Sequence, residues 1–350
     1  MATMKAVRLV KPLDLRLMDV EIPEIGPHDV LCRVVRAGMC GTDYAIYSGE
    51  FSFVKSGDVP FPMTLGHEWS GVVAKTGSDV MYFSPGDRVV GDTAVACGHC
   101  HECLVGQYGL CKHCRAVGTI RAWDGAYAQY ILMPERHLMH LPANVDFDNG
   151  AFVEPAATAL LAVKRAEVGI SDTVLVIGSG PIGIAAAKLA KLCGAAKVAI
   201  AARKDYKLKA AMDLGVDGAI NTTRMSLKDG IKEQFGEWGV DKIVEASGST
   251  AMFAEALKVI NTSGAMSVVA FYEKTLEHFD IDRMVFGDVR IIPSAGSLGM
   301  YKAILRLMER GILDLRPLIT ARYRLEDVPQ AMKDMKGKNE TRIKMMIEQD

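Results

Sequence analysis

The stretch TVLVIGSGPIGI, residues 173–184, decides the fold class. A short run of β-forming residues ends at Gly178, and Gly178, Gly180 and Gly183 form the pattern GxGxxG directly before a helical run. In this setting the first glycine permits a tight turn, the second lets the backbone approach a pyrophosphate, and the third lets helix and strand pack closely. The predicted dinucleotide-binding turn consists of Gly178, Ser179, Gly180, Pro181, Ile182 and Gly183.

The end of the next predicted strand, 197–202, bears on the choice between NAD and NADP. An acidic residue about 20 positions past the glycines would hydrogen-bond the ribose 2′-hydroxyl of NAD. This chain has Ala202 followed by Arg203 and Lys204. Because a guanidinium binds phosphate well and no carboxylate stands there to repel it, we predict that Ala202 and Arg203 contact NADP. In the alternative, Arg203 and Lys204 are solvated and Asp205 binds the ribose of NAD.

The regions on either side of this stretch differ in their pattern of predicted strands and helices. Short β-type runs broken by glycine and proline occur at 5–10, 29–38, 70–77, 87–92 and 126–134. After Pro142, predicted strands at 173–178, 197–202, 240–247 and 265–271 alternate with predicted helices at 182–195, 207–215 and 251–260. The tail has two helical runs, 301–312 and 328–335, and a final strand, 342–348. We therefore expect an α/β protein in which a β-rich domain precedes a doubly wound parallel sheet.

Composition excludes several classes of partner. The 350 residues contain 41 Lys plus Arg and 42 Asp plus Glu, so the chain has no strong field to attract nucleic acid or an anionic membrane. It shows neither the apolar core of a signal peptide nor an apolar run long enough for a transmembrane helix. We expect a cytoplasmic protein that acts on a small molecule.

Five of the eight cysteines lie between Cys97 and Cys114. Cys97, Cys100, Cys103 and Cys111 form C-x2-C-x2-C-x7-C, which supplies the four thiolates of a closed tetrahedral zinc site. Such a site stabilises its loop and leaves no position for a substrate. Cys114 could replace Cys111 in a shifted register. A nucleic-acid-binding zinc ribbon is the rival interpretation, but the overall charge balance argues against it.

A second set of metal-ligating side chains comes from distant segments: Cys40, His67, Glu68 and Glu154. A catalytic zinc needs about three protein ligands and one open position. The motif HExxH is missing, because Ser70 and Gly71 follow, so a metalloprotease is disfavoured. Taken singly, Cys40 would be a buried apolar residue, His67 a core histidine and Glu154 a carboxylate in the first turn of a helix.

These motifs together resemble a known family. In chain order they are Cys40-Gly-Thr-Asp, Gly66-His67-Glu68, the four-cysteine lobe, Glu154-Pro155 and the GxGxxG turn. That order is similar to the zinc-dependent medium-chain alcohol dehydrogenases, over essentially the whole chain. The resemblance implies a GroES-like catalytic domain at 1–153, a Rossmann domain at 154–293, and a segment at 294–350 that returns to the first domain.

The resemblance also implies roles for individual residues. Cys40, His67 and Glu154 would bind the catalytic zinc directly or through water, and Glu68 could exchange in. Asp43 would orient His67. Thr42 would accept the substrate proton, and Tyr47 would either line the pocket or simply pack in the core. Ala45 departs from relatives with a proton-relaying histidine, so proton release must take another route.

Glutamate at position 154 resembles the sorbitol and polyol dehydrogenase branch. The phrases GHEWSG (66–71), GDTAVACGHC (91–100) and VEASG (244–248) are similar to cyclitol and galactitol-phosphate dehydrogenases. We therefore expect hydride transfer between a polyol, cyclitol or sugar derivative and NADP or NAD, with one catalytic and one structural zinc per subunit in a homodimer or homotetramer. The alternatives are a zinc-independent quinone or enone reductase of the same fold, and a nucleotide-binding structural protein without turnover.

Overall fold

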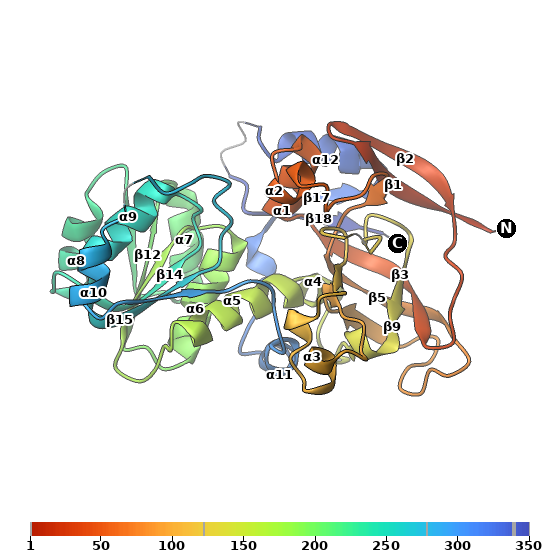
Figure 1. Cartoon of the computed structure of the whole chain (residues 1–350), viewed down its shortest axis with the longest axis horizontal. Coiled ribbons are helices and arrows are strands. Elements are labelled where there is room, and N and C mark those ends of the chain that lie inside the picture. Colours follow the sequence, from red (N-terminus) through yellow and green to blue (C-terminus); the bar gives the residue numbers. More distant parts are fainter. Residues whose placement is uncertain (1, 122, 278, 338–340, 350) are drawn as a thin grey trace. The chain divides into compact units, whose positions relative to one another are not determined.

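Two different kinds of sheet divide the chain into two units (Figure 1). The computed structural model describes residues 2–121, 123–277, 279–337 and 341–349. Unit 1 contains the described residues up to Glu154 and from Tyr301 onward, and unit 2 runs from Pro155 to Met300. Among the described residues, no helix combines the length and the apolar character that crossing a bilayer would require.

Unit 2 is built on a parallel sheet with the strand order β13-β12-β11-β14-β15-β16. Its strands are β11 (Thr173–Ile177), β12 (Lys197–Ala202), β13 (Gly218–Asn221), β14 (Val240–Glu245), β15 (Ile260–Val268) and β16 (Arg290–Pro293). Its helices are α6 (Pro181–Leu192), α7 (Asp205–Asp213), α8 (Leu227–Phe235), α9 (Thr250–Val259) and α10 (Ile281–Phe286). The order reverses between β11 and β14, and in such sheets ligands bind outside the carboxyl ends of the strands at that point.

Local signals explain much of unit 2. The strands β11 and β12 are almost entirely buried, as expected of parallel strands covered on both faces. Helix α8 begins where Ser226 accepts a hydrogen bond from the backbone of Asp229, and it ends at Gly236 in the left-handed conformation. The edge strands β13 and β16 were not among the predicted strands, because each has only four residues and too little periodicity.

Unit 1 consists mainly of antiparallel strands. One sheet has the order β2-β1-β4, with β1 (Thr3–Lys11), β2 (Asp14–Glu21) and β4 (Met63–Thr64). A larger sheet has the order β10-β6-β5-β3-β18-β17, with β9 also paired to β3. Its strands are β3 (Asp29–Gly38), β5 (Glu68–Thr76), β6 (Arg88–Gly91), β9 (Tyr130–Pro134), β10 (Leu138–His140), β17 (Ile319–Arg324) and β18 (Lys344–Glu348). The short strands β7 (Ala94–Val95) and β8 (Arg115–Ala116) pair with each other.

Unit 1 also contains helices. The α-helices before residue 166 were not predicted, whereas the two α-helices after residue 300 lie within the predicted helical runs 301–312 and 328–335. The α-helices are α1 (Gly41–Ser48), α2 (Ser52–Lys55), α3 (His101–Leu104), α4 (Phe147–Ala151), α5 (Val153–Arg165, which continues into unit 2), α11 (Tyr301–Glu309) and α12 (Val328–Asp334). The 3₁₀ turns are η1 (Tyr108–Leu110), η2 (Glu135–His137), η3 (Arg316–Leu318) and η4 (Leu325–Asp327). Most of these helices are too short for a clear helical period. Helices α5 and α11 are longer, and α11 buries Tyr301, Ile304, Leu305 and Met308 along one face.

The central strand β3 brings together segments that are far apart in the sequence. Its residue Gly38 pairs with Glu68 of β5 on one side and with Met346 of β18 on the other. The core around this point includes Trp69, Leu65 and Tyr127, all nearly inaccessible to solvent. The last described strand is therefore an internal part of the sheet that carries one candidate metal site.

Candidate metal and nucleotide sites

Cys40, His67 and Glu68 form a compact set of metal-ligating groups. Their thiol, imidazole and carboxylate atoms all lie within 4.8 Å of one another, and His67 and Glu68 are buried. Cys40 is the N-cap residue of α1, Glu68 is the first residue of β5, and His67 directly precedes that strand. A cysteine, a histidine and a carboxylate are the donor types that zinc prefers, so this set fits a zinc ion chemically.

Asp43 contacts two members of this cluster, Cys40 and His67. Its Oδ2 accepts hydrogen bonds from the backbone N–H of Cys40 and from the hydroxyl of Tyr127, both at 2.8 Å, and its Oδ1 lies 3.5 Å from Nδ1 of His67. Burial opposes ionisation of Asp43, but His67, the Cys40 N–H and the Tyr127 hydroxyl together lower its pKa. A carboxylate that accepts the Nδ1 proton would leave Nε2 of His67 for a metal.

Electrostatics at the cluster favour a cation. Burial acts against the charged imidazolium, yet Asp43 and Cys40 raise the pKa of His67 well above its ordinary value. The same negative groups that stabilise a proton on the ring would stabilise a divalent metal ion bound there. The position before His67 requires glycine, because Gly66 has a φ of +94° and a Cβ there would lie 2.6 Å from the ring of Tyr127.

Lys344 is a neighbour of the cluster that we did not predict. Its ammonium pairs with Oε2 of Glu68, donates to the carbonyl of Met39 at 3.0 Å and lies 5.8 Å from the ring centre of Phe152. The side chains of Lys344 and Glu68 are 1% and 2% exposed. The pair exists because β18 and β5 both flank β3 at Gly38. A lysine at the start of the apolar run KMMI was the one signal available in the sequence.

Glu154 is buried in the first turn of α5. The group of ligand atoms within 4.8 Å described above consists of Cys40, His67 and Glu68 and does not include it. The structure therefore brings together three of the four residues predicted for the catalytic metal, and leaves the role of Glu154 as a prediction.

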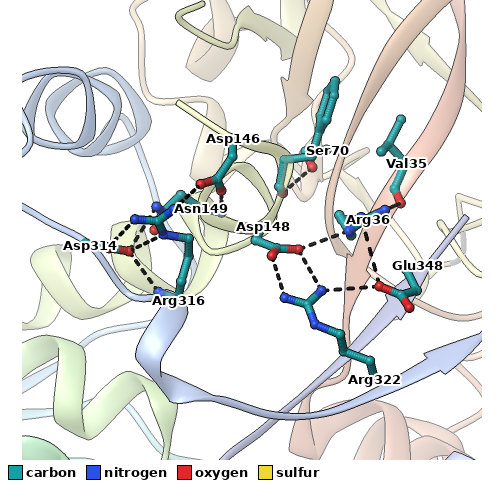
Figure 2. Close-up of polar contacts among 11 residues, drawn as sticks. Val35, Arg36, Ser70, Asp146, Asp148, Asn149, Asp314, Arg316, Arg322 and Glu348 are labelled. Carbon is teal, nitrogen blue, oxygen red and sulfur yellow. Dashed lines mark hydrogen bonds and ion pairs between the residues drawn. The ribbon is translucent and has the colours of Figure 1, made fainter. Parts of the chain in front are cut away.

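A polar network fixes α4, the helix that immediately precedes Glu154 (Figure 2). Asp148 pairs with Arg36 at 3.0 Å and with Arg322 at 2.6 Å, and Arg322 also contacts Glu348 at 3.3 Å. Burial disfavours ionisation of Asp148, but Arg322 and Arg36 hold its pKa below the ordinary value. The Asp148 carboxylate thus joins α4 to β3 and β17, and Arg322 extends the network to β18.

The other end of the network holds α4 to the segment around residue 314 (Figure 2). Asn149 donates to Asp314 at 3.0 Å and accepts from the backbone N–H of Leu315 at 3.0 Å. The hydrogen bond from Arg316 lowers the pKa of Asp314 to about 2. Asp146 caps α4 by accepting from the backbone of Asn149. These contacts hold α4, the helix before α5, to the segment 314–316 of unit 1.

Two further predicted residues lie on α1. Oγ1 of Thr42 is 3.7 Å from Sγ of Cys40, so its hydroxyl lies beside the candidate metal ligands. Tyr47 is 7% exposed, belongs to the hydrophobic core of unit 1, and packs edge-on against Tyr44 with ring centres 5.9 Å apart. The surroundings of Tyr47 are those of a packing residue.

The four predicted thiols of the second site also lie together. Cys97, Cys100, Cys103 and Cys111 have ligand atoms within 4.8 Å of one another, with Sγ–Sγ distances of 3.5, 3.6 and 3.9 Å among them. A tetrahedral zinc with Zn–S bonds of about 2.3 Å would require separations of about 3.8 Å. The backbone N–H of His99 and other nearby donors lower the pKa of Cys97 to about 6. Cys114 lies outside the group.

The glycine turn lies at the carboxyl end of β11. Gly178 has a φ of +107°, Gly180 precedes α6 as its N-cap, and Pro181 occupies its first turn. The N-terminus of α6 is thus available for a pyrophosphate. Ser179 is buried, and Gly183 packs so closely on Gly178 that a Cβ would lie 2.0 Å from its carbonyl oxygen.

The charged side chains that follow β12 differ in their ion pairs and hydrogen bonds. Arg203 and Lys204 are exposed, and no ion pair joins either side chain to another described residue. Asp205 is also exposed, but its carboxylate accepts from Asn221 at 2.6 Å and pairs with Arg224.

Comparison with known proteins identifies the family. Residues 26–143 match the family model described as alcohol dehydrogenase GroES-like domain, and residues 181–310 match the model described as zinc-binding dehydrogenase. An L-threonine 3-dehydrogenase from Deinococcus deserti is 34% identical over 322 residues, which cover 91% of this chain and 92% of the relative. The chain belongs to the zinc-binding medium-chain alcohol dehydrogenases.

Solved structures agree with this assignment of the dehydrogenase. A protein from Sinorhizobium meliloti described as a zinc-binding dehydrogenase, bound to NADP, superposes with a TM-score of 0.91 at 28% identity and covers both chains fully. Galactitol-1-phosphate dehydrogenase from Escherichia coli gives a TM-score of 0.87 at 28% identity, covering 99% of this chain and 100% of the other. The predicted fold class, a GroES-like domain with a Rossmann domain, is confirmed, and so is the family. The polyol branch stays a prediction.

Proposed function

We propose that this dehydrogenase exchanges a hydride between a secondary alcohol and NADP, using zinc held by Cys40, His67 and a glutamate. The observation that carries the proposal is the cluster of Cys40, His67 and Glu68 ligand atoms within 4.8 Å, with Oδ1 of Asp43 3.5 Å from Nδ1 of His67. A zinc-independent quinone or enone reductase would not need these metal-ligating side chains. The residue set is also more specific than a nucleotide-binding structural protein would require.

The chain's own residues would prepare the substrate for hydride loss. When bound, zinc supplies the Lewis acidity that lowers the pKa of a substrate hydroxyl. Thr42, beside Cys40, would accept the proton from that hydroxyl while passing its own hydroxyl proton on. Because Ala45 on the same helix has no titratable group, the proton would leave through solvent or a cofactor hydroxyl. Asp43 would keep His67 in one tautomer and one orientation throughout.

The glycine turn and Arg203 would hold the dinucleotide, whose nicotinamide ring is the hydride acceptor. The exposed guanidinium of Arg203 is free of ion pairs to described residues and could bind a 2′-phosphate. Asp205 is less suited to bind the ribose of NAD, since Asn221 and Arg224 already occupy its carboxylate. These observations support NADP over NAD.

Two substrate classes share the chemistry that this site would serve. The motifs around Glu68 and Glu154 support a polyol, cyclitol or sugar derivative, whereas the L-threonine 3-dehydrogenase relatives support a 3-hydroxy amino acid. Both are secondary alcohols with a polar substituent on the adjacent carbon. We propose this wider class as the substrate, and a homodimer or homotetramer in the cytoplasm as the working form.

A combined metal and substrate experiment tests the proposal. Purified protein should contain two zinc ions per chain, lose activity on chelation and regain it with zinc. A panel of polyols, cyclitols, sugar phosphates and 3-hydroxy amino acids, each with NAD and NADP, identifies the substrate by nicotinamide absorbance.

The variant Cys40→Ser should retain one zinc ion and lose activity. The control Cys193→Ser on unit 2 should keep both zinc ions and full activity. Activity that survives chelation would favour the reductase. Inactivity with every substrate would favour the structural protein.

A further inference from the structure

Glu245 is a fully buried carboxylate at the carboxyl end of β14. Its 0% exposure is unusual for a glutamate, and no ion pair joins it to a described cation. Its Oε1 instead accepts from the backbone N–H of Ser247 at 3.0 Å and from the Ser247 hydroxyl, while Oε2 accepts from the hydroxyl of Tyr272. Three donors satisfy one buried carboxylate, which is the arrangement that makes its burial tolerable.

These hydrogen bonds join two loops. Ser247 belongs to the loop 246–249 after β14, where its hydroxyl also accepts from the backbone N–H of Ser249 at 3.1 Å. Tyr272 follows β15, and its ring packs edge-on against Phe253. The two loops touch directly, because a Cβ on Gly248 would lie 2.9 Å from the carbonyl oxygen of Phe271. Burial and the Glu245 carboxylate raise the pKa of Tyr272, so its hydroxyl remains a donor.

The loop 246–249 in turn supports the glycine turn. A Cβ on Gly178 would lie 2.7 Å from the carbonyl oxygen of Ala246 and 2.9 Å from the backbone nitrogen of Ser247. Strands β11, β14 and β15 are neighbours in the sheet, so all three loops lie at one edge, at the point where the strand order reverses. This is where a doubly wound sheet binds a dinucleotide.

In a doubly wound sheet of this type, each half of the sheet binds one half of the dinucleotide. The residues after β12 contact the adenosine ribose in this fold, which leaves the edge at β14 and β15 for the nicotinamide nucleotide. We propose that Glu245 is a positioning residue that holds loop 246–249 and Tyr272 as the platform for the nicotinamide half of the cofactor. The inference rests on the proposed use of a nicotinamide dinucleotide, and Glu245 acts through the loops without touching the cofactor.

Binding of whole and half cofactors by the full-length, zinc-loaded protein tests the role. Calorimetric titrations would use NADPH and adenosine 2′,5′-bisphosphate, with NADH and AMP in parallel. Glu245→Leu removes all three acceptors and should weaken NADPH binding about tenfold, since each hydrogen bond to a charged group contributes measurably. Binding of adenosine 2′,5′-bisphosphate should change less than about twofold, because only the nicotinamide platform is disturbed.

Two milder variants keep the test decisive if Glu245→Leu fails to fold. Tyr272→Phe removes one donor, keeps the ring against Phe253, and should weaken NADPH binding about threefold. Glu245→Gln should bind almost as the native chain does, because its amide oxygen still accepts from Ser247 and its amide nitrogen donates to the Tyr272 hydroxyl.

Asp241 provides a matched control at the opposite end of β14. Its carboxylate joins the same three strands, accepting from the N–H and hydroxyl of Thr173 at 2.8 and 2.7 Å and from Asn261 at 2.9 Å. Asp241→Asn should leave the affinities for both ligands unchanged.

Equal weakening of both ligands, unchanged NADPH binding in Glu245→Leu and Tyr272→Phe, or the same selective loss in Asp241→Asn would overturn the role of Glu245. A native chain that binds neither dinucleotide would instead refute the proposed cofactor, so the two failures are distinguishable.

Discussion

Replacing Lys344 by methionine should strongly destabilise unit 1. The ammonium of Lys344 and the carboxylate of Glu68 are both almost inaccessible to solvent, and they pair inside the sheet formed by β5, β3 and β18. Methionine keeps most of the side-chain volume and removes the charge. Glu68 would then be left as a buried carboxylate without its partner, which is the costly outcome for an ion pair in the interior.

The expected loss in the free energy of unfolding follows from the burial of both side chains. Removing one partner of a buried pair costs about 3–5 kcal/mol, because the remaining charge is neither solvated nor compensated. For a unit of this size that corresponds to a fall in Tm of roughly 6–20 °C. The double variant Lys344→Met with Glu68→Gln removes both charges, so it should lie within about 2 kcal/mol of the native chain. The coupling energy between the two positions should therefore exceed about 1 kcal/mol.

Urea unfolding of the zinc-free protein in the presence of a chelator measures these differences without a metal ion that could compensate the Glu68 carboxylate. Unfolding is followed by tryptophan fluorescence, to which the buried Trp69 next to Glu68 contributes. The control is Lys336→Met, which breaks the Lys336–Glu50 pair, whose side chains are 59% and 64% exposed. That change should cost less than about 1 kcal/mol. A cost for Lys344→Met no larger than that of the control, or purely additive effects in the double variant, would refute the reasoning.

Three further changes test other parts of the dehydrogenase. Arg203→Ala should raise the Michaelis constant for NADP about tenfold or more and that for NAD little, because a charged hydrogen bond to the 2′-phosphate is lost; equal effects in steady-state kinetics would contradict the cofactor preference. Asp148→Asn should cost about 1 kcal/mol near pH 7, an estimate reduced for the solvent exposure of its arginine partners. Since the pKa of Asp148 is lowered in the folded state, this contribution is complete above the unfolded value of about 4 and disappears as the pH falls through the folded value, so denaturation curves of the two proteins should converge in acid. Cys111→Ser should reduce the zinc content from two ions to one and lower the Tm, whereas Cys114→Ser, outside the thiol group, should change neither; equal zinc loss in both variants would mean that Cys114 is a ligand.

Local patterns in the sequence were enough to predict the family and the fold class. The glycine turn directly follows a strand and precedes a helix, so its meaning depends on residues within one βα unit. The four-cysteine lobe spans only 15 residues, from Cys97 to Cys111, and spacing within such a short loop already limits where the thiols can lie. The short edge strands and the small helices of unit 1 escaped prediction because they are too brief to show a period.

The Lys344–Glu68 pair, by contrast, was decided by tertiary structure, since 276 positions separate its members. It arises because two strands pair with opposite sides of β3 at the same glycine, and strand register cannot be inferred from either strand alone. The same holds for Glu245, whose donors come from loops after two neighbouring strands, and for Asp148, whose arginine partners lie on the two distant strands β3 and β17. Residue types and short-range spacing, read from the chain itself, predicted the chemistry, whereas the register of distant strands determined which buried charges meet and which groups hold the predicted sites in place.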